Sequence, residues 1–245
     1  MLPNVYIAVI LLSLLSALAT LIGVFLALYC KKSDKVIVVG LGFSTGTMLA
    51  ISFFELIPEA VKTAGFLPAS IAIILGALLI FSLHLIIPHI HYVKEGGSLS
   101  WQMKAAYLVA LGMILHDFPE GFAMANSYVY APTLGILIAI SIAIHNIPEE
   151  FAMAVPLVIA RNRKALVNLA ILSGLAEPLG AIFGLFFVSI APSLNPFFLA
   201  VAAGAMIFVS LHELYPMAQR YKKLPFFIFG FVLSLVVYWG LSLMF

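Results

Sequence analysis

LHDFPEGFAMA (115–125) and IHNIPEEFAMA (144–154) are two stretches of nearly the same sequence, and their first residues are 29 positions apart. Each contains a histidine, an acidic or amide residue, a proline and a glutamate in the same order, and each lies inside a long apolar run. Ionisable side chains are rare in membrane spans and are functional candidates wherever they occur there. The repeat raises the question of what two such helices hold between them.

The composition is that of a polytopic membrane protein. Of the 245 residues, 64% are hydrophobic and 9% are charged, whereas a soluble domain carries about 25% charged residues. We expect one transmembrane domain over residues 1–245, with the first apolar run being a span and not a signal peptide. The single cysteine, Cys30, excludes an internal disulfide framework. Nothing in the net charge of +2 indicates nucleic acid as a partner.

Eight segments are long enough to cross a bilayer, which takes about 20 apolar residues. These segments are 4–29, 36–60, 68–90, 102–126, 132–160, 166–191, 196–219 and 224–245. The pattern predicts an all-α fold of eight transmembrane helices joined by short connectors. Of the 12 Lys and Arg residues, all except Lys62 lie in or beside alternate connectors. Because basic loops stay in the cytoplasm, we expect a multi-pass protein of the cell (inner) membrane with both termini extracytoplasmic.

A second internal repeat relates spans two and seven. GTMLAISFFELIPEA (46–60) and GAMIFVSLHELYPMA (204–218) align without gaps, with Gly, Met, Ser, Glu, Leu, Pro and Ala coinciding. By the charge rule, these two spans run in opposite directions, as do spans four and five. Helices related in this way indicate an inverted repeat, an architecture of many secondary transporters that bind substrate near the midplane of the membrane.

Most of the acidic residues lie in the predicted spans. Of ten in the chain, eight are in apolar segments: Glu55, Glu59, Asp117, Glu120, Glu149, Glu150, Glu177 and Glu213. A charged carboxylate at the centre of a span costs roughly 2.5–3.5 kcal/mol on insertion scales. No Lys or Arg lies in mid-span to neutralise these groups, so protons, water or a bound cation must do so.

The spacing of the first repeat explains its residue types. Residues four apart share one face of a helix, so His116 lies beside Glu120 and His145 beside Glu149. Two such helices, antiparallel and facing each other, offer two imidazole nitrogens and two carboxylates, a set suited to zinc or a similar divalent ion. The alternative is a polar lock, in which the same side chains hydrogen-bond to one another across the helix interface.

The neighbouring positions of the repeat add to this site. Asp117 and Asn146 lie about 100° further around their helices and can give oxygen ligands to an adjacent ion. Pro119 and Pro148 each lack an N–H, so each is expected to kink its helix and to free a carbonyl group beside the histidine. Irregular backbone at membrane depth is tolerated where it lines a polar cavity.

Four motifs together carry a family resemblance: HDFPEG (116–121), HNIPE (145–149), SGLAEPLG (173–180) and SLHELYP (210–216). On these motifs the chain resembles the ZIP (Zrt/Irt-like) family of divalent-metal transporters, and most closely its compact bacterial ZupT/GufA branch. The resemblance covers essentially the whole chain. It implies eight spans in a 3+2+3 layout, with spans one to three and six to eight as inverted repeats around a metal core in spans four and five. It also suggests a homodimer in the lipid bilayer.

The resemblance implies a binuclear metal site without a prosthetic group, the ion being the cargo. The first metal site corresponds to His116, Glu120, His145 and Glu149. The second corresponds to Asp117, Asn146 and Glu177, with Glu120 and Glu149 bridging. The chain departs from the branch pattern at Asp117, where Asn is usual, and at Glu150, where Gly is usual. Because Glu150 lies about 100° from the face of Glu149, we expect it to face water between spans rather than to bind metal.

Further residues mark a pathway for the ion. Glu55 and Glu59 share a face near the outer end of span two and suit an entrance that attracts cations. His212 and Glu213 lie toward the inner end of span seven and suit an exit, and His89 and His91 flank an inner loop that could accept released metal. His84 and four methionines are expected to pack against helices: Met48, Met124, Met153 and Met206.

We therefore predict a transporter that moves divalent transition metals from outside into the cytoplasm. Zinc is the main expected cargo, and Cd, Fe, Mn and Co are the other candidates. The main alternative is an intramembrane metal-dependent hydrolase. HELYP (212–216) lacks the second histidine of a zinc protease, however, and carboxylates crowd the centre where a hydrolase needs an open metal position. A metal sensor would need an output domain, and proton transport alone leaves the twin motif unexplained. We expect no enzymatic activity.

Overall fold

The computed structural model describes residues 3–30, 33–86, 101–159, 161 and 163–245, and every regular element in these ranges is helical. The α-helices are α1 (Pro3–Tyr29), α2 (Asp34–Ala50), α3 (Ile57–Ala64), α4 (Phe66–Ile86), α5 (Trp101–Tyr130), α6 (Pro132–Ile159), α7 (Arg163–Ile190), α8 (Asn195–Val209), α9 (Tyr215–Arg220) and α10 (Leu224–Ser242). Two π-helical turns, η1 (Ile51–Leu56) and η4 (Ser210–Leu214), and one 3-10 turn, η3 (Pro192–Leu194), complete them. The predicted all-α class is confirmed.

In the part of the chain that the structure describes, seven helices are long and apolar enough to cross a membrane. Two of them are composite: α2, η1 and α3 run on as Asp34–Ala64, and η3, α8, η4 and α9 run on as Pro192–Arg220. The remaining predicted span, 102–126, coincides with α5, a 30-residue helix that carries the first histidine motif. The chain is thus a multi-pass membrane protein, as its composition predicts.

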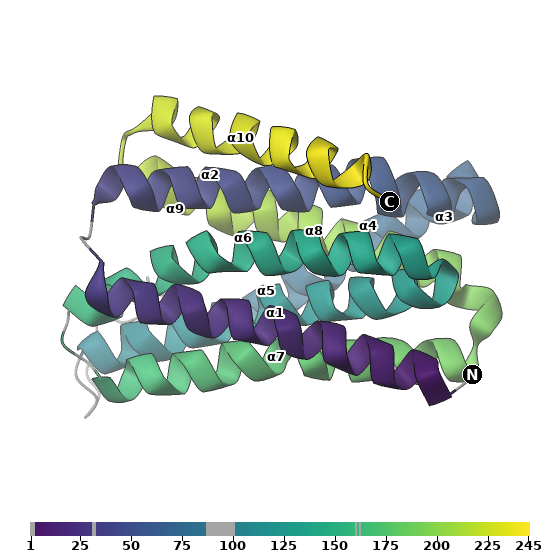
Figure 1. Cartoon of the computed structure of the whole chain (residues 1–245), viewed down its shortest axis with the longest axis horizontal. Helices are drawn as coiled ribbons and strands as arrows, with labels where there is room; N and C mark the ends of the chain where they lie inside the picture. The colour runs from purple at the N-terminus through teal and green to yellow at the C-terminus, as the bar shows by residue number, and fades with distance from the viewer. Residues whose placement is uncertain (1–2, 31–32, 87–100, 160, 162) are drawn as a thin grey trace.

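The helices lie side by side along the long axis of the molecule, and both termini are at the same end (Figure 1). The end of α1, the start of α2, the start of α7 and the connector from α9 to α10 all lie at the opposite end (Figure 1). There Lys223 Nζ lies 2.7 Å from a carboxylate oxygen of Asp34. The basic residues that the structure describes beside these segments, among them Lys35, Arg163 and Lys223, therefore lie toward one end of the bundle.

Burial separates inner helices from outer ones. In the most apolar stretch of each span, 78% of the Asp34–Ala64 residues and 72% of the α6 residues are buried, against 22% in both α4 and α10. The outer helices expose large apolar side chains, among them Leu75, Leu78, Phe229 and Val236. Lipid tails are as apolar as leucine, so exposure to them carries no hydrophobic penalty. The outer surface of the bundle thus fits contact with acyl chains.

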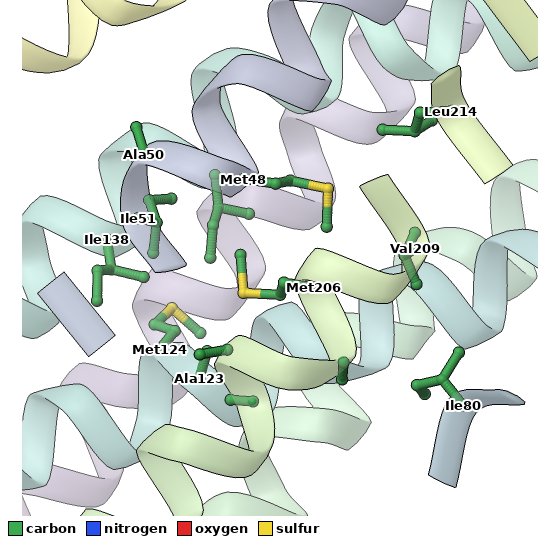
Figure 2. Close-up of a cluster of buried hydrophobic side chains, with 14 of the residues drawn as sticks. Met48, Ala50, Ile51, Ile80, Ala123, Met124, Ile138, Met206, Val209 and Leu214 are labelled. Carbon is green, nitrogen blue, oxygen red and sulfur yellow. The ribbon is translucent and has the colours of Figure 1, made fainter. Parts of the chain in front are cut away.

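Methionines fill the centre of the bundle. Met48 of α2, Met124 of α5 and Met206 of α8 gather in one cluster with Ile51 and Ile138 (Figure 2), and the three thioether side chains are at most 1% exposed. Unbranched methionine side chains fill irregular gaps well. The predicted packing role is confirmed for these three, and for Met153, which is also buried.

Paired glycines let neighbouring helices touch through their backbones. Gly76 and Gly204 face each other between α4 and α8, and Gly42 and Gly230 do the same between α2 and α10. A Cβ atom at Gly204 would lie 1.9 Å from the backbone oxygen of Ile73, and the other three would meet a backbone oxygen at 2.0 to 2.2 Å. We call these two contacts the glycine seams. Close approach of this kind stabilises helix pairs in membranes through van der Waals contact.

The two π-helical turns occupy equivalent places in the repeated segments. η1 and η4 each begin at or just before the shared serine and end two residues before a proline, Pro58 or Pro216. A proline cannot donate to the carbonyl group four residues before it, which favours the wider turn. The repeat found in the sequence therefore also exists as shared local structure, and π-turns in helices are frequent at functional sites.

The glycine seams generate a prediction. Gly204→Ala should lower the free energy of unfolding by about 1–3 kcal/mol, because the new methyl group must push two backbones apart. Gly240→Ala is the matched control, since a Cβ there meets nothing within 4 Å and alanine favours the helix. The measurement is the thermal unfolding midpoint in detergent. Equal unfolding midpoints for the two variants would show that the close contact at Gly204 does not contribute to stability.

Candidate metal centre

The two histidine motifs meet where α5 packs on α6. His145 Nε2 lies 3.0 Å from Oε1 of Glu120 on the other helix, and His116 Nε2 contacts a carboxylate oxygen of Glu149. Within each helix the His–Glu separations are longer, 4.0 Å for His116 and Glu120 and 3.9 Å for His145 and Glu149. All four residues are 0–4% exposed. The predicted face-to-face arrangement is thus present, with each histidine directed at the glutamate of the opposite helix.

These separations are on the scale of a small metal site. Tetrahedral coordination with bonds near 2.1 Å places neighbouring ligand atoms roughly 3.4 Å apart. As the side chains lie, however, they pair two by two, and no three His, Cys, Asp or Glu residues in the described ranges are already arranged around a common point. The polar lock and the metal site therefore use the same four groups, and only small shifts separate the two arrangements.

A third contact orients His145 for this role. Its Nδ1 lies 2.9 Å from the backbone oxygen of Ser141, one turn earlier in α6. With Nδ1–H donating to this carbonyl, a neutral His145 has its lone pair at Nε2, where a metal ion can bind. To donate to the carboxylate of Glu120, Nε2 must instead carry a second proton. Both α5 and α6 continue through Pro119 and Pro148 as single helices, so neither proline ends the helix that carries the ligands.

A second polar cluster lies next to the first, between α6, α7 and α1. Asn146 Nδ2 donates to Glu177 Oε1 at 2.5 Å, and Ser16 Oγ donates to the same oxygen at 2.9 Å. Asn146 also reaches Thr20 Oγ1 at 3.5 Å. All of these side chains are at most 2% exposed. Asn146 and Glu177 thus come together as the family resemblance implies.

Asp117 lies on the other side of this region, against α7. Ser173 Oγ is 2.5 Å from Oδ2 of Asp117 and also contacts Oε1 of Glu150. The expectation that Glu150 faces water is wrong, because its side chain is only 1% exposed. The direction 100° from Glu149 leads not to a gap between spans but to Ser173 on α7. A helical position shows where a side chain points, and only packing shows what lies there.

The predicted inner residues form a separate group. His84 Nδ1 of α4 lies 3.1 Å from Oε1 of Glu213, and the rings of His84 and His212 are 5.6 Å apart. His84, expected only to pack, does pack against Phe208 but also faces this carboxylate. Glu213 is also near enough to the first motif to interact electrostatically with His116. His89 and His91 lie outside the described residues.

The predicted outer residues are divided between two neighbours. Glu55 accepts a hydrogen bond from Tyr238 of α10, while Glu59 accepts one of 2.6 Å from Tyr130 of α5. Lys62 Nζ lies 3.7 Å from Glu59 and partly offsets its charge. Both glutamates lie on the span formed by α2, η1 and α3, and α3, which carries Glu59, lies toward the end of the bundle that holds the termini (Figure 1). They are anchored by tyrosines rather than free in a common opening.

Three hydroxyl residues of the site are absent from the predicted set: Ser16, Thr20 and Ser173. A sequence signal exists for two of them, since Ser16 and Thr20 are four residues apart in an otherwise apolar span and so share a face. Serine and threonine in spans are common, however, because their hydroxyl groups bond to their own helix. Ser70 and Ser82 of α4 do so, each donating to a carbonyl four residues earlier.

Comparison with known proteins gives the family. The model described as "ZIP Zinc transporter" matches residues 89–245 and thus includes all four motifs and the parts of both polar clusters that lie on α5, α6 and α7. The chain belongs to the ZIP family. It is 36% identical to the zinc transporter ZupT of Chlorobium phaeovibrioides, over 93% of this chain and 94% of the relative. It is 37% identical to the ZupT of Corynebacterium aurimucosum, over 91% and 92% of the two chains. The ZupT of Stenotrophomonas maltophilia strain R551-3 is 32% identical, over 94% and 92%.

Membership in the ZIP family, and in its ZupT branch, decides between the predicted functions. The protein is a transporter of divalent metal ions, and the intramembrane hydrolase is rejected. The alignments with these relatives cover more than nine tenths of both chains, so the family likeness extends over the apolar helices as well as the motifs.

Metal binding at the four-residue centre generates a prediction. Zinc at 100 times its dissociation constant should stabilise the folded protein by about 2.7 kcal/mol, since the ion binds only the folded site. Glu120→Gln and His145→Ala should lose most of this stabilisation. Asp34→Asn is the control, because Asp34 is an exposed acid paired with Lys223. The measurement is the unfolding midpoint with and without zinc. A zinc-dependent shift that survives both site substitutions would place the ion elsewhere.

Proposed function

We propose that the protein imports divalent transition metals, zinc first among them, through a binuclear site at the α5/α6 interface. One observation carries this proposal: two histidines and two glutamates from the twin motifs meet in a dry interface, at 0–4% exposure. The zinc-transporter names of the relatives support zinc as the cargo. Mixed imidazole and carboxylate ligands without thiolate also suit Cd, Fe, Mn and Co.

We further infer that the fold is a 3+2+3 arrangement of inverted repeats forming one domain. The helix pairs support it: α5 packs on α7 as α6 packs on α1, and α2 packs on α10 as α8 packs on α4. In this arrangement spans one, two and three correspond to spans six, seven and eight, and span four corresponds to span five. When corresponding spans are exchanged, each of these helix pairs becomes its counterpart. SALATLIG (16–23) of α1 and SGLAEPLG (173–180) of α7 add a third matched segment.

The direction of transport follows from the proposed orientation in the cell membrane. With the basic connectors in the cytoplasm, both termini are outside, Glu55 and Glu59 lie toward the outer side, and His212 and Glu213 lie toward the inner side. An ion would pass from the outer acids to the first centre, with the Asp117, Asn146 and Glu177 group beside it, and leave past the inner group. A homodimer is the assembly that the family resemblance favours.

The paired side chains give this centre a way to alternate. As the side chains lie, His116 contacts Glu149 and His145 contacts Glu120, so each carboxylate of this pair has a partner on the opposite helix. An arriving cation replaces both contacts and neutralises the carboxylates. Movement of the other helices of the repeats, α2, α4, α8 and α10, relative to α5 and α6 would then expose the occupied centre to the cytoplasm, where the pairs reform as the ion leaves.

Uptake of metal into proteoliposomes tests the proposal directly. Wild type, His145→Ala and Glu120→Ala are compared with Zn, Cd, Fe and Mn offered separately. We expect both substitutions to lower uptake at least about tenfold, as loss of a metal ligand does, while Asp34→Asn transports like wild type. If the two variants transport as fast as wild type, the twin motif is a structural lock, and the path must run along Glu55, Glu59 and Glu213.

The pH dependence gives a second test. Metal ligands must be deprotonated, so protons compete with the ion at both histidines and at the carboxylates. Uptake should therefore fall as the outer pH is lowered from neutral, with the apparent KM for zinc rising. The measurement is initial uptake against pH at fixed zinc. A steady rise on acidification would instead indicate proton-driven coupling.

A further inference from the structure

Glu150 differs from its counterpart in the chain's own repeat. HDFPEG (116–121) and HNIPEE (145–150) match position by position, so Glu150 stands where α5 has Gly121. At Gly121 the neighbouring backbone excludes any side chain, because a Cβ there would lie 2.0 Å from the backbone oxygen of Glu177. A glutamate at the equivalent position of α6 therefore fits only if the helix facing it leaves room for a side chain.

On α1, the residue facing Glu150 is Gly23. A Cβ atom at Gly23 would lie 2.6 Å from the Cβ of Glu150 and 2.5 Å from the backbone oxygen of Ile147. The glycine thus makes room for the start of the Glu150 side chain at a point where α1 and α6 are in contact. In the matched segments of α1 and α7, Thr20 also stands where α7 has Glu177. The α1/α6 half thus has no acid at this position of α1, but α6 carries Glu150 in addition to Glu149.

The carboxylate of Glu150 reaches into the region of Asp117 and Glu177. Its Oε1 contacts Ser173 Oγ, which lies 2.5 Å from Asp117 Oδ2. Its Oε2 is buried and has no hydrogen-bond partner among the described residues, and the same holds for Oε2 of Glu177. The carboxylates of Glu150, Glu120 and Glu177 all interact electrostatically with Asp117. Buried carboxylate oxygens without a donor are costly unless a cation compensates them.

We propose that Glu150 is a cation-binding residue of the second site and makes that site selective for hard divalent ions, for which Mn²⁺ is the probe. The oxygen donors there are Ser173 with Asp117 and Glu150, and Glu177, which is near enough to Asp117 to interact with it electrostatically; none is an imidazole or a thiolate. These side chains do not yet surround a common point in the described part of the chain, so a bound cation would draw them together. Such oxygen sets suit Mn²⁺ and Mg²⁺, whereas the histidine pair suits zinc. The inference rests on the proposed function, in which this second site holds cargo.

The test compares Mn²⁺ binding to purified wild type, Glu150→Gln and Glu150→Asp by electron paramagnetic resonance. Glu150→Gln should weaken Mn²⁺ binding at least about tenfold, because site affinity follows the number of charged oxygen ligands. Zinc at one equivalent, which takes the histidine centre first, should bind within about threefold of wild type. Glu150→Asp should keep most of the Mn²⁺ affinity, and Asp34→Asn should keep all of it. Unfolding midpoints identify any variant that fails to fold.

The outcomes separate this inference from the proposed function. If Glu150→Gln folds and binds Mn²⁺ as tightly as wild type, or if wild type binds no Mn²⁺, the role of Glu150 is overturned. If zinc and Mn²⁺ binding weaken equally, Glu150 acts on the whole centre and is not selective, which also overturns it. Failure of the proposed function would instead appear as wild-type protein that moves no metal into proteoliposomes.

Discussion

The cross-helix contact of His145 with Glu120 and of His116 with Glu149 is the interaction on which the rest of the structure depends. Four ionisable groups at 0–4% exposure are tolerated inside a bilayer only if each faces an opposite partner or a cation. Their pairing fixes the register of α5 against α6. Removing one member would leave the other buried and unpaired, which costs more than the pair contributes.

Around this contact the two halves of the chain are alike but not identical. α1 and α7 both place a serine against the α5/α6 pair, Ser16 beside Asn146 and Ser173 beside Asp117. The third partner differs, being Glu177 on one side and Glu150 on the other. The backbone symmetry therefore sets where polar groups can gather, and a few substitutions at equivalent positions decide what each gathering binds.

The sequence predicts features of the fold and of the site that depend on one helix alone, and it fails for features that depend on which helices are neighbours. The i, i+4 spacing of His116 and Glu120 is a property of one helix, so the sequence correctly predicted that the two side chains lie on one face, and it also predicted the buried methionines. The surroundings of Glu150 and the partner of His84 depend on which helix lies 100° away, and no local pattern encodes that. Ser173 was invisible for another reason, since serine is ordinary in apolar helices. Each π-turn lies just before a proline in the repeated segments. Neither the proline nor the repeat predicts a π-turn when taken alone.

The glycine seams have a mechanical consequence. Helices whose backbones interlock at a missing Cβ cannot slide along each other, so α2 with α10, and α4 with α8, each behave as one stiff pair. Gly121 and Gly180 join α5 to α7 in the same way, each Cβ meeting backbone oxygen at 2.0 to 2.1 Å, and Gly23 joins α1 to α6. All residues of the twin-motif region thus ride on one block of α1, α5, α6 and α7. The block meets α2 at Gly40, where a Cβ would lie 2.8 Å from the backbone oxygen of Pro148. It meets α8 through the side chains of Met124 and Met206, and because methionine side chains adapt easily, this second surface can shift more readily than the first.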